Sequence, residues 1–106
     1  MRGAVVTGSA KGLGKAVALM LAKEGYGVAI NYNKSKKEAT KTLAELRKIN
    51  SRCIAARGDL TAERNVKRLF AAAKKKFGRS DILVNNIGDF IYKPILHTTA
   101  EEVKHV

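Results

Sequence analysis

The sequence predicts an α/β protein in which helices flank one parallel sheet. Short apolar runs alternate along the chain with longer stretches whose apolar residues recur at helical spacing. Gly8, Gly12 and Gly14 follow directly on the first apolar run, as expected for a turn from a strand into a helix. The continuous apolar run at residues 82–84 indicates a strand that is buried on both faces, which is typical of parallel sheets.

Four strands are expected, at residues 4–6, 28–32, 53–56 and 81–86, with helices between them. The first helix ends at Gly25 and the third at Gly78, because glycine readily adopts the left-handed conformation that closes a helix. A capping box at residues 35–38 begins the second helix, and Thr61 caps the third. The faces expected to be buried comprise Leu13, Val17, Met20 and Leu21, then Ala39, Leu43, Leu46 and Ile49, then Val66, Leu69, Phe70, Ala73 and Phe77.

After the fourth strand we expect a loop that contains Pro94, the only proline. A further capping box at residues 99–102 predicts a last helix that begins near Ala100. The order of elements implies right-handed crossovers within one sheet. The 106 residues fit one domain that spans residues 1–106.

Composition sets further limits. The net charge of +12 attracts polyanions, but the basic residues are spread along helices, as solvated faces are. No stretch approaches 18 consecutive apolar residues, so no transmembrane helix is expected, nor a signal peptide. Cys53 is the only cysteine, lies in an expected strand and suits a reducing cytoplasm. His97 and His105 lack the cysteine or clustered acidic partners of a metal site.

The stretch VVTGSAKGLG at residues 5–14 predicts a phosphate-binding loop. It precedes the first helix, whose N-terminal N–H groups and dipole attract an anion. Glycine is favoured because a side chain would hold a pyrophosphate away from those donors. A Walker loop is excluded, since Ala16 follows Lys15 where that loop has a hydroxyl residue. Ser9 is interpreted as a phosphate contact. The alternative for the whole glycine loop is a tight turn that binds no ligand.

The residues after the second strand favour NADP over NAD. Sites for NAD usually have an acidic residue roughly 20 positions after the glycines, where it binds the ribose 2′-hydroxyl. Here the strand ends in Tyr32, Asn33, Lys34 and Ser35, without a carboxylate. Lys34 and Ser35 are expected to hold a 2′-phosphate from one side and Lys11 from the other, by charge pairing. The alternative is that both lysines are solvated surface residues.

With these features the sequence resembles the short-chain dehydrogenase/reductase family over essentially its whole length. Residues 7–14 match the family's T-G-x-x-x-G-x-G loop, in which Lys11 is the basic residue common in NADP-using members. Asp59 and Leu60 match the position after the third strand that contacts adenine. Residues 85–88 match the motif N-N-A-G, with Ile87 in place of alanine. The resemblance implies a Rossmann-like sheet of about four strands in the order 3-2-1-4, truncated before the fifth.

The resemblance also implies NADP(H) as the cofactor. Asp59 accepts a hydrogen bond from the adenine amino group and the backbone of Leu60 completes that contact; a local helix cap is the alternative role of Asp59. Asn86 and Gly88 let the backbone lie against the ribose, where Ile87 adds bulk. The expected cofactor-binding residues are Gly8, Ser9, Lys11, Gly12, Leu13, Gly14, Tyr32, Asn33, Lys34, Ser35, Asp59, Leu60, Asn86, Ile87 and Gly88.

The family's catalytic residues are not expected in this chain. Members have roughly 250 residues, and the serine, tyrosine and lysine that serve hydride transfer from the nicotinamide lie after a fifth strand. Tyr32 and Lys36 match the spacing Y-x-x-x-K, but they lie beside the expected adenosine phosphate. We therefore expect the isolated chain to be inactive. Within the family, NYNKSKKEA and DILVNNIG are most similar to 3-oxoacyl-[acyl-carrier-protein] reductases.

The order 3-2-1-4 would leave the fourth strand at an edge, with Ile82, Leu83 and Val84 partly uncovered. An unpaired edge invites pairing. We therefore expect that the chain belongs to a longer protein or associates with itself along that strand.

Three functions remain open at this point. The first is the NADP-binding part of a carbonyl reductase, and the second is a stand-alone nucleotide-binding module without catalysis. The third is a nucleic-acid-binding protein, suggested by the net charge of +12 and the run at residues 74–76. The third lacks interleaved aromatic residues and a recognition module.

Overall fold

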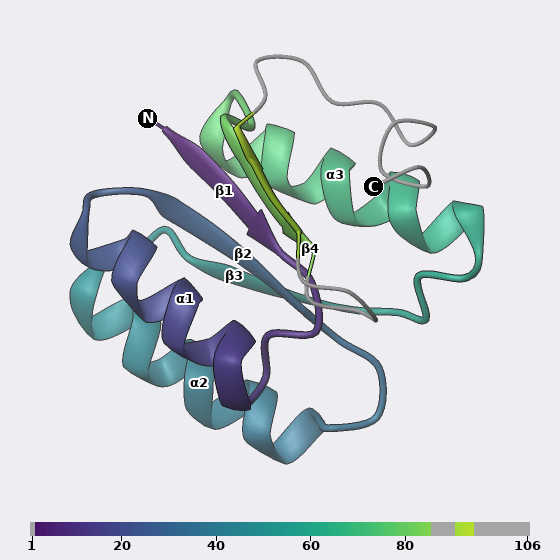
Figure 1. The fold of residues 1–106 in the computed structure, drawn as a ribbon, viewed down its shortest axis with the longest axis horizontal. Coiled ribbons are helices and arrows are strands. Elements are labelled where there is room, and N and C mark those ends of the chain that lie inside the picture. Colours follow the sequence, from purple (N-terminus) through teal and green to yellow (C-terminus); the bar gives the residue numbers. More distant parts are fainter. Residues whose placement is uncertain (1, 86–90, 95–106) are drawn as a thin grey trace.

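The computed structural model describes residues 2–85 and 91–94, which form a three-layer α/β unit (Figure 1). The helix expected near Ala100 lies outside the described residues. The elements are, in chain order, β1 (Gly3–Val6), α1 (Gly12–Lys23), β2 (Gly27–Tyr32), α2 (Lys36–Ile49), β3 (Ile54–Arg57), α3 (Glu63–Phe77), β4 (Ile82–Asn85) and β5 (Ile91–Pro94).

The four parallel strands lie in the order β3-β2-β1-β4, which confirms the predicted order 3-2-1-4. β1 is central, with Val5 in register with Ala29 of β2 and with Leu83 of β4. Figure 1 shows α1 and α2 on one face of the sheet and α3 on the other. Because parallel strands end at the same edge, the segments that leave β1, β2 and β3 start close together.

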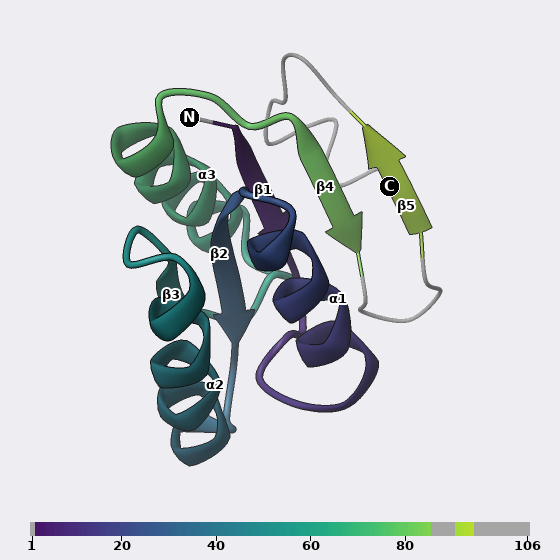
Figure 2. The same cartoon turned by 90° about the vertical axis from the view of Figure 1, so that its left-hand side faces the viewer.

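The edge strand differs from the prediction. β5 pairs antiparallel with β4 and forms the edge of the sheet, as Figure 2 shows. Ile82, Leu83 and Val84 are buried in the cores on the two faces of the sheet rather than partly uncovered. Pro94 belongs to β5, where its missing N–H is tolerated because the strand lies at an edge. The described sheet therefore lacks the free β4 edge from which self-association was argued.

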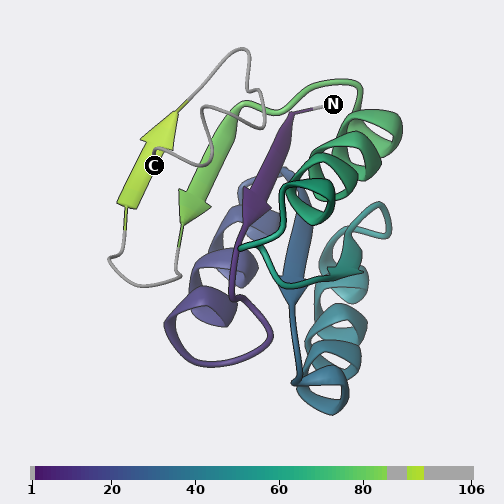
Figure 3. The same ribbon diagram turned by 90° about the vertical axis from the view of Figure 1, so that its right-hand side faces the viewer.

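Two apolar cores lie on the two faces of the sheet, because successive strand residues point to opposite sides. Val6, Ile30 and Val84 pack with α1 and α2. Val5 and Leu83 pack with α3, which Figure 3 shows in front of the sheet. Burial of each Val, Leu or Ile side chain stabilises the fold by roughly 1.5–3 kcal/mol. Strands that are apolar at successive positions therefore favour a sheet with helices packed on both faces.

The helix faces agree with the sequence pattern in α3 and only in part elsewhere. Val66, Leu69, Ala73 and Phe77 of α3 are buried and Phe70 packs beside them, as predicted. In α1, however, Leu13 is 59% exposed and Met20 55%, and in α2 Ile49 is 40% exposed. The buried side of α1 consists instead of Gly14, Ala18, Leu21 and Ala22. Apolar residues occupy most of α1, so helical spacing alone could not identify the face that meets the sheet.

The helix ends show one confirmed signal and two corrections. Gly25 and Gly78 have φ angles of 96° and 84° and follow α1 and α3, as predicted. Ser35 occupies the N-cap position of α2 but makes no capping hydrogen bond. Ala62, not Thr61, is the N-cap of α3. The Thr61 hydroxyl donates instead to Asp59 Oδ1 at 2.8 Å, a local hydrogen bond of the kind that competes with helix capping.

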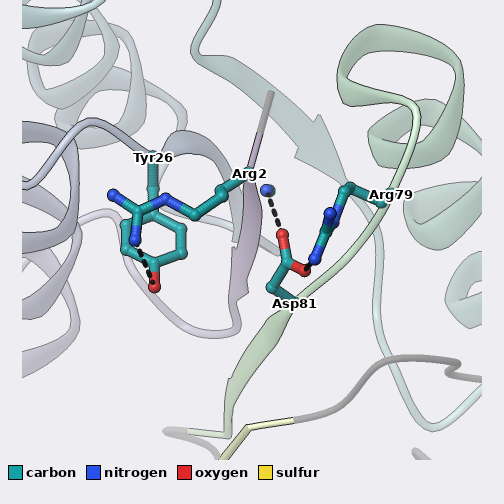
Figure 4. A network of polar contacts seen from close by, with 5 residues as sticks. Arg2, Tyr26, Arg79 and Asp81 are labelled. Carbon is teal, nitrogen blue, oxygen red and sulfur yellow. Dashed lines mark hydrogen bonds and ion pairs between the residues drawn. The ribbon is translucent and has the colours of Figure 1, made fainter.

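The starts of β1 and β4 are joined around Gly3 (Figure 4). The Asp81 N–H donates to the Gly3 carbonyl at 2.8 Å, and Asp81 Oδ2 accepts the Gly3 N–H at 3.0 Å. Arg79 Nε donates to Asp81 Oδ1 at 2.6 Å. On the other side of β1, the Arg2 guanidinium lies 4.3 Å from the centroid of the Tyr26 ring. These contacts fix the register of β1 at the edge opposite the glycine loop.

We predict that Gly3→Ala destabilises the fold by about 1–3 kcal/mol, the usual cost of overpacking. A Cβ atom on Gly3 would overlap the carbonyl oxygen of Arg79, and this oxygen belongs to the backbone and cannot swing away. Urea unfolding measures the loss. Arg79→Ala is the control, because it removes the ion pair between the exposed Arg79 side chain and the largely buried Asp81 carboxylate but keeps the backbone oxygen in place, and we expect the smaller loss. Equal losses in the two variants would contradict the explanation.

Candidate nucleotide-binding site

The glycine loop leads from β1 into the exposed N-terminus of α1. Gly8 and Gly12 have φ angles of 56° and 64°, in the left-handed region that favours glycine. A Cβ atom on Gly12 would meet no protein atom within 4 Å, so the space beside it is open. The first turn of α1 is closed by the Lys15 N–H, which donates to the Lys11 carbonyl at 3.4 Å. The N–H groups of Gly12, Leu13 and Gly14 precede that bond and are available to an anion.

The polar atoms of the loop that point inward are bonded to neighbouring elements. The Thr7 N–H donates to the Val84 carbonyl of β4 at 3.0 Å, and the Thr7 hydroxyl donates to Asn85 Oδ1 at 3.0 Å. The Gly8 N–H donates to Asn31 Oδ1 at 3.3 Å. These bonds attach the loop to β2 and β4, the strands on either side of β1.

Ser9 differs from its predicted role as a phosphate contact. Its side chain is fully buried, and its hydroxyl donates to the Val6 carbonyl at 2.6 Å. The same oxygen accepts the Asn31 N–H at 3.0 Å, and the Ser9 N–H donates to the Asn31 carbonyl at 3.0 Å. The polar groups of Ser9 are therefore occupied in shaping the loop, and the motif letter alone could not show that the hydroxyl points inward.

Asn31 is a site residue that the sequence analysis missed. It is 2% exposed, and its Nδ2 donates to the carbonyls of Ala56 and Gly58 at 3.4 and 3.2 Å. Together with its bond from Gly8, the amide joins the glycine loop, β2 and the end of β3. One signal was present in the sequence, namely a single amide that ends the apolar run at residues 28–30.

Thr42 was also missed, and it supports the loop from α2. Its buried hydroxyl donates to the Ala10 carbonyl at 2.6 Å. No local pattern indicates this contact, because it joins residues that lie 32 positions apart. It fixes the last part of the loop before α1 begins.

A pocket of about 400 Å³ lies between the glycine loop and the residues that follow β2. Lys11 comes from the loop and Lys34 from the β2–α2 connection, so the two predicted cations line one cavity. The lining residues are Gly8, Ala10, Lys11, Asn31, Tyr32, Asn33, Lys34 and Ser35, which include six of the predicted cofactor-binding residues and no carboxylate.

The other predicted positions lie outside this lining. Gly12 and Leu13 are exposed at the start of α1, next to the pocket residue Lys11, and Gly14 is buried there. Leu60 packs against the core on the α3 side. The predicted residues Asn86, Ile87 and Gly88 fall outside the described part of the chain.

Asp59 forms a local turn before α3 rather than the helix cap of its alternative interpretation, since no side chain caps α3. Its Oδ1 accepts the Thr61 N–H at 2.9 Å as well as the Thr61 hydroxyl. These hydrogen bonds lower the pKa of the Asp59 carboxyl, and the positive charge of Lys34 acts in the same direction. Asp59 is therefore an ionised, exposed carboxylate at neutral pH, and its contact with adenine stays a prediction.

Lys15 belongs to the helix packing and not to the pocket. Its Nζ lies 2.7 Å from Oε2 of Glu45 on α2, and this contact is the main cause that lowers the pKa of the Glu45 carboxyl. Tyr32 lines the pocket and Lys36 begins α2, and their position beside the adenosine stays a prediction. Cys53 is buried, which raises the pKa of its thiol.

Neither a metal nor a membrane site is indicated in the described residues. They contain no group of three or more His, Cys, Asp or Glu that could hold a metal ion. None of the described helices is long and apolar enough to cross a bilayer.

Comparison with known proteins agrees with this geometry. The family model described as short chain dehydrogenase matches residues 2–106. The chain belongs to the short-chain dehydrogenase family. The hydroxynaphthalene reductase-like protein Arp2 of Metarhizium robertsii is 42% identical over 97% of this chain, which covers 39% of that relative. The hydroxynaphthalene reductase arp2 of Aspergillus fumigatus is 39% identical over the same share of this chain and 38% of its own length.

A solved structure agrees as well. A variant of actinorhodin polyketide ketoreductase, crystallised with NADPH, has a TM-score of 0.74 and 32% identity over 83% of this chain and 33% of that chain. The chain thus spans about two fifths of the length of the curated relatives given above and a third of that ketoreductase.

We predict that Thr42→Val lowers the free energy of unfolding by about 1–3 kcal/mol, because it leaves the Ala10 carbonyl without its buried donor. Faster amide exchange in the glycine loop accompanies this loss. Thr40→Val is the matched control on the same helix: its exposed hydroxyl donates only to the Lys36 carbonyl, so we expect a change within about 0.5 kcal/mol. Similar effects of both changes would contradict the supporting role of Thr42.

Proposed function

We propose that this chain is the NADP(H)-binding part of a short-chain reductase that transfers a hydride from NADPH to a ketone. The observation that carries the proposal is the pocket between the glycine loop and the end of β2, which Lys11 and Lys34 line without a carboxylate. An acidic residue at this place favours NAD by binding the ribose 2′-hydroxyl, whereas cations favour a 2′-phosphate.

Different residues of the site would bind different parts of the proposed cofactor. The N–H groups at the start of α1, beside Gly12, would receive the pyrophosphate. Lys11, Lys34 and Ser35 would hold the 2′-phosphate in the pocket. The nicotinamide supplies the hydride when the cofactor is bound. The 32% identical ketoreductase solved with NADPH supports this choice of cofactor.

The substrate is proposed only as a ketone. The names of the relatives indicate hydroxynaphthalenes and polyketides as substrates of those proteins. A 3-oxoacyl thioester, the finer prediction from the sequence, also presents a ketone, but none of the relatives given above bears that name. A hydroxynaphthalene presents a ketone in its keto tautomer, so reduction of a ketone carbonyl is a step that these possibilities can share.

A stand-alone nucleotide-binding module is the second candidate. Such a module would bind the dinucleotide in the same pocket without catalysing hydride transfer. Nucleic-acid binding receives less support, since Lys74, Lys75 and Lys76 lie in the last turn of α3, where cations complement the helix dipole. We further propose a cytoplasmic location, from the single buried thiol.

We predict that the chain binds NADPH more tightly than NADH, and that Lys34→Ala weakens NADPH about tenfold. A charge-assisted hydrogen bond of roughly 1.5 kcal/mol corresponds to such a factor. NADH, which lacks the 2′-phosphate, should change less than about twofold. Fluorescence or calorimetric titration measures both constants.

Two variants control this titration. Lys37→Ala removes an exposed lysine of α2 outside the pocket lining, and it should leave both affinities unchanged. Gly12→Val should abolish binding of both dinucleotides. Valine does not readily adopt the positive φ of Gly12, and its side chain would enter the open space beside the loop that the pyrophosphate is proposed to occupy. Equal affinity of the unmodified chain for NADPH and NADH would contradict the proposed cofactor.

We also predict that the 106-residue chain binds NADPH without oxidising it when a ketone is supplied. The absorbance of NADPH should stay constant at protein concentrations that saturate it. Fusion to the remaining portion of a relative should restore turnover if the chain is one part of a reductase. Oxidation by the chain alone would show that its own residues suffice for the chemistry.

A further inference from the structure

Arg57 lies at the proposed phosphate side of the pocket, although neither the glycine loop nor the β2–α2 connection contains it. It is the last residue of β3 and is in register with Tyr32, the last residue of β2. Tyr32 lines the pocket. Arg57 therefore stands at the carboxyl edge of the sheet, one strand away from the cavity.

The side chain of Arg57 is on the same face of the sheet as the pocket. Ala55 of β3 and Ile30 of β2 pack with the core of α1 and α2. Residues two positions apart on a strand share a face, so Arg57 and Tyr32 also face the α1–α2 side. The glycine loop runs into α1 on this side (Figure 2).

One hydrogen bond directs the guanidinium toward the pocket segment. Arg57 Nε donates to the Asn33 carbonyl at 3.3 Å, and Asn33 lines the pocket next to Lys34. An arginine has five N–H donors, so four remain on its two terminal nitrogens. Within residues 2–85 and 91–94, no hydrogen bond or ion pair engages those four.

The nearest acidic residue in the sequence does not neutralise this cation. Asp59 lies two positions after Arg57, and its Oδ1 accepts two hydrogen bonds from Thr61. The ion pairs of the described residues do not include Arg57. Its charge thus remains available beside Lys34, on a side chain whose planar fork matches phosphate oxygens.

We propose that Arg57 is a specificity-determining residue, whose guanidinium, held against Asn33, gives a third positive charge to the 2′-phosphate of a dinucleotide. Lys11, Lys34 and Arg57 then approach that phosphate from three different segments. The proposal rests on the proposed function, since it assigns a residue of β3 to the same cofactor site.

Titration of the full chain with NADPH and NADH tests the proposal through Arg57→Gln. We expect NADPH binding to weaken about five- to tenfold and NADH binding to change less than about twofold. The affinity for adenosine 2′,5′-bisphosphate should fall as that for NADPH does, and the affinity for 5′-AMP should stay nearly unchanged, as that for NADH does. Arg52→Gln is the matched control, because Arg52 also contacts a backbone carbonyl, that of Lys76, but precedes β3 at the opposite edge. It should alter neither affinity.

Arg57→Lys separates a charge effect from a structural one. It keeps the positive charge but not the planar fork, so it should recover part of the affinity for NADPH that Arg57→Gln loses. If NADPH binding is equally weak in both variants, the bond to Asn33 is only structural and the proposal is overturned. Unchanged NADPH binding in Arg57→Gln, while the unmodified chain prefers NADPH, also overturns it and leaves the proposed function standing. A chain that binds both dinucleotides equally overturns both.

Discussion

Asn31 joins three segments that would otherwise only converge at the carboxyl edge of the sheet. Its buried amide accepts a hydrogen bond from Gly8 and donates to the carbonyls of Ala56 and Gly58 at the end of β3, while its backbone exchanges bonds with Ser9. A buried amide that loses its partners costs about 1–3 kcal/mol, so this arrangement strongly disfavours other loop conformations. The left-handed conformation of Gly8 is therefore held by the surrounding structure as well as permitted by the residue.

The bonds of Asn31, Thr7 and Thr42 also determine which backbone groups remain for a ligand. They engage the inward polar atoms of the loop from β4, β2 and α2. The N–H groups at the start of α1 take no part in these bonds and lie beside the open space at Gly12. A loop that is fixed before binding loses little conformational freedom when an anion arrives. The support from neighbouring elements is thus part of the binding site.

Much of this arrangement could be predicted from the sequence, because strand runs, the glycine spacing and the resemblance each identify local features. Lys11 and Lys34 were placed together in this way, and the structure puts them in one pocket. The supporting contacts could not be predicted, since Thr42 meets Ala10 across 32 positions of sequence. The inward direction of the Ser9 hydroxyl and the antiparallel pairing of β5 likewise depend on tertiary neighbours that no local pattern encodes.

The end of β3 shows how neighbouring charges can take different roles through hydrogen bonding. Asp59 and Arg57 have opposite charges and are separated by one residue, yet Asp59 bonds to Thr61 and Arg57 to the Asn33 carbonyl. The N–H and hydroxyl of Thr61 stabilise the carboxylate, so it does not require the guanidinium as a partner. Because the acid is satisfied within its own turn, the cation can face the pocket segment beside Lys34. The net charge of +12 attracts anions in general. A single cation can recognise a particular phosphate only where local hydrogen bonds keep the neighbouring acidic group away from it.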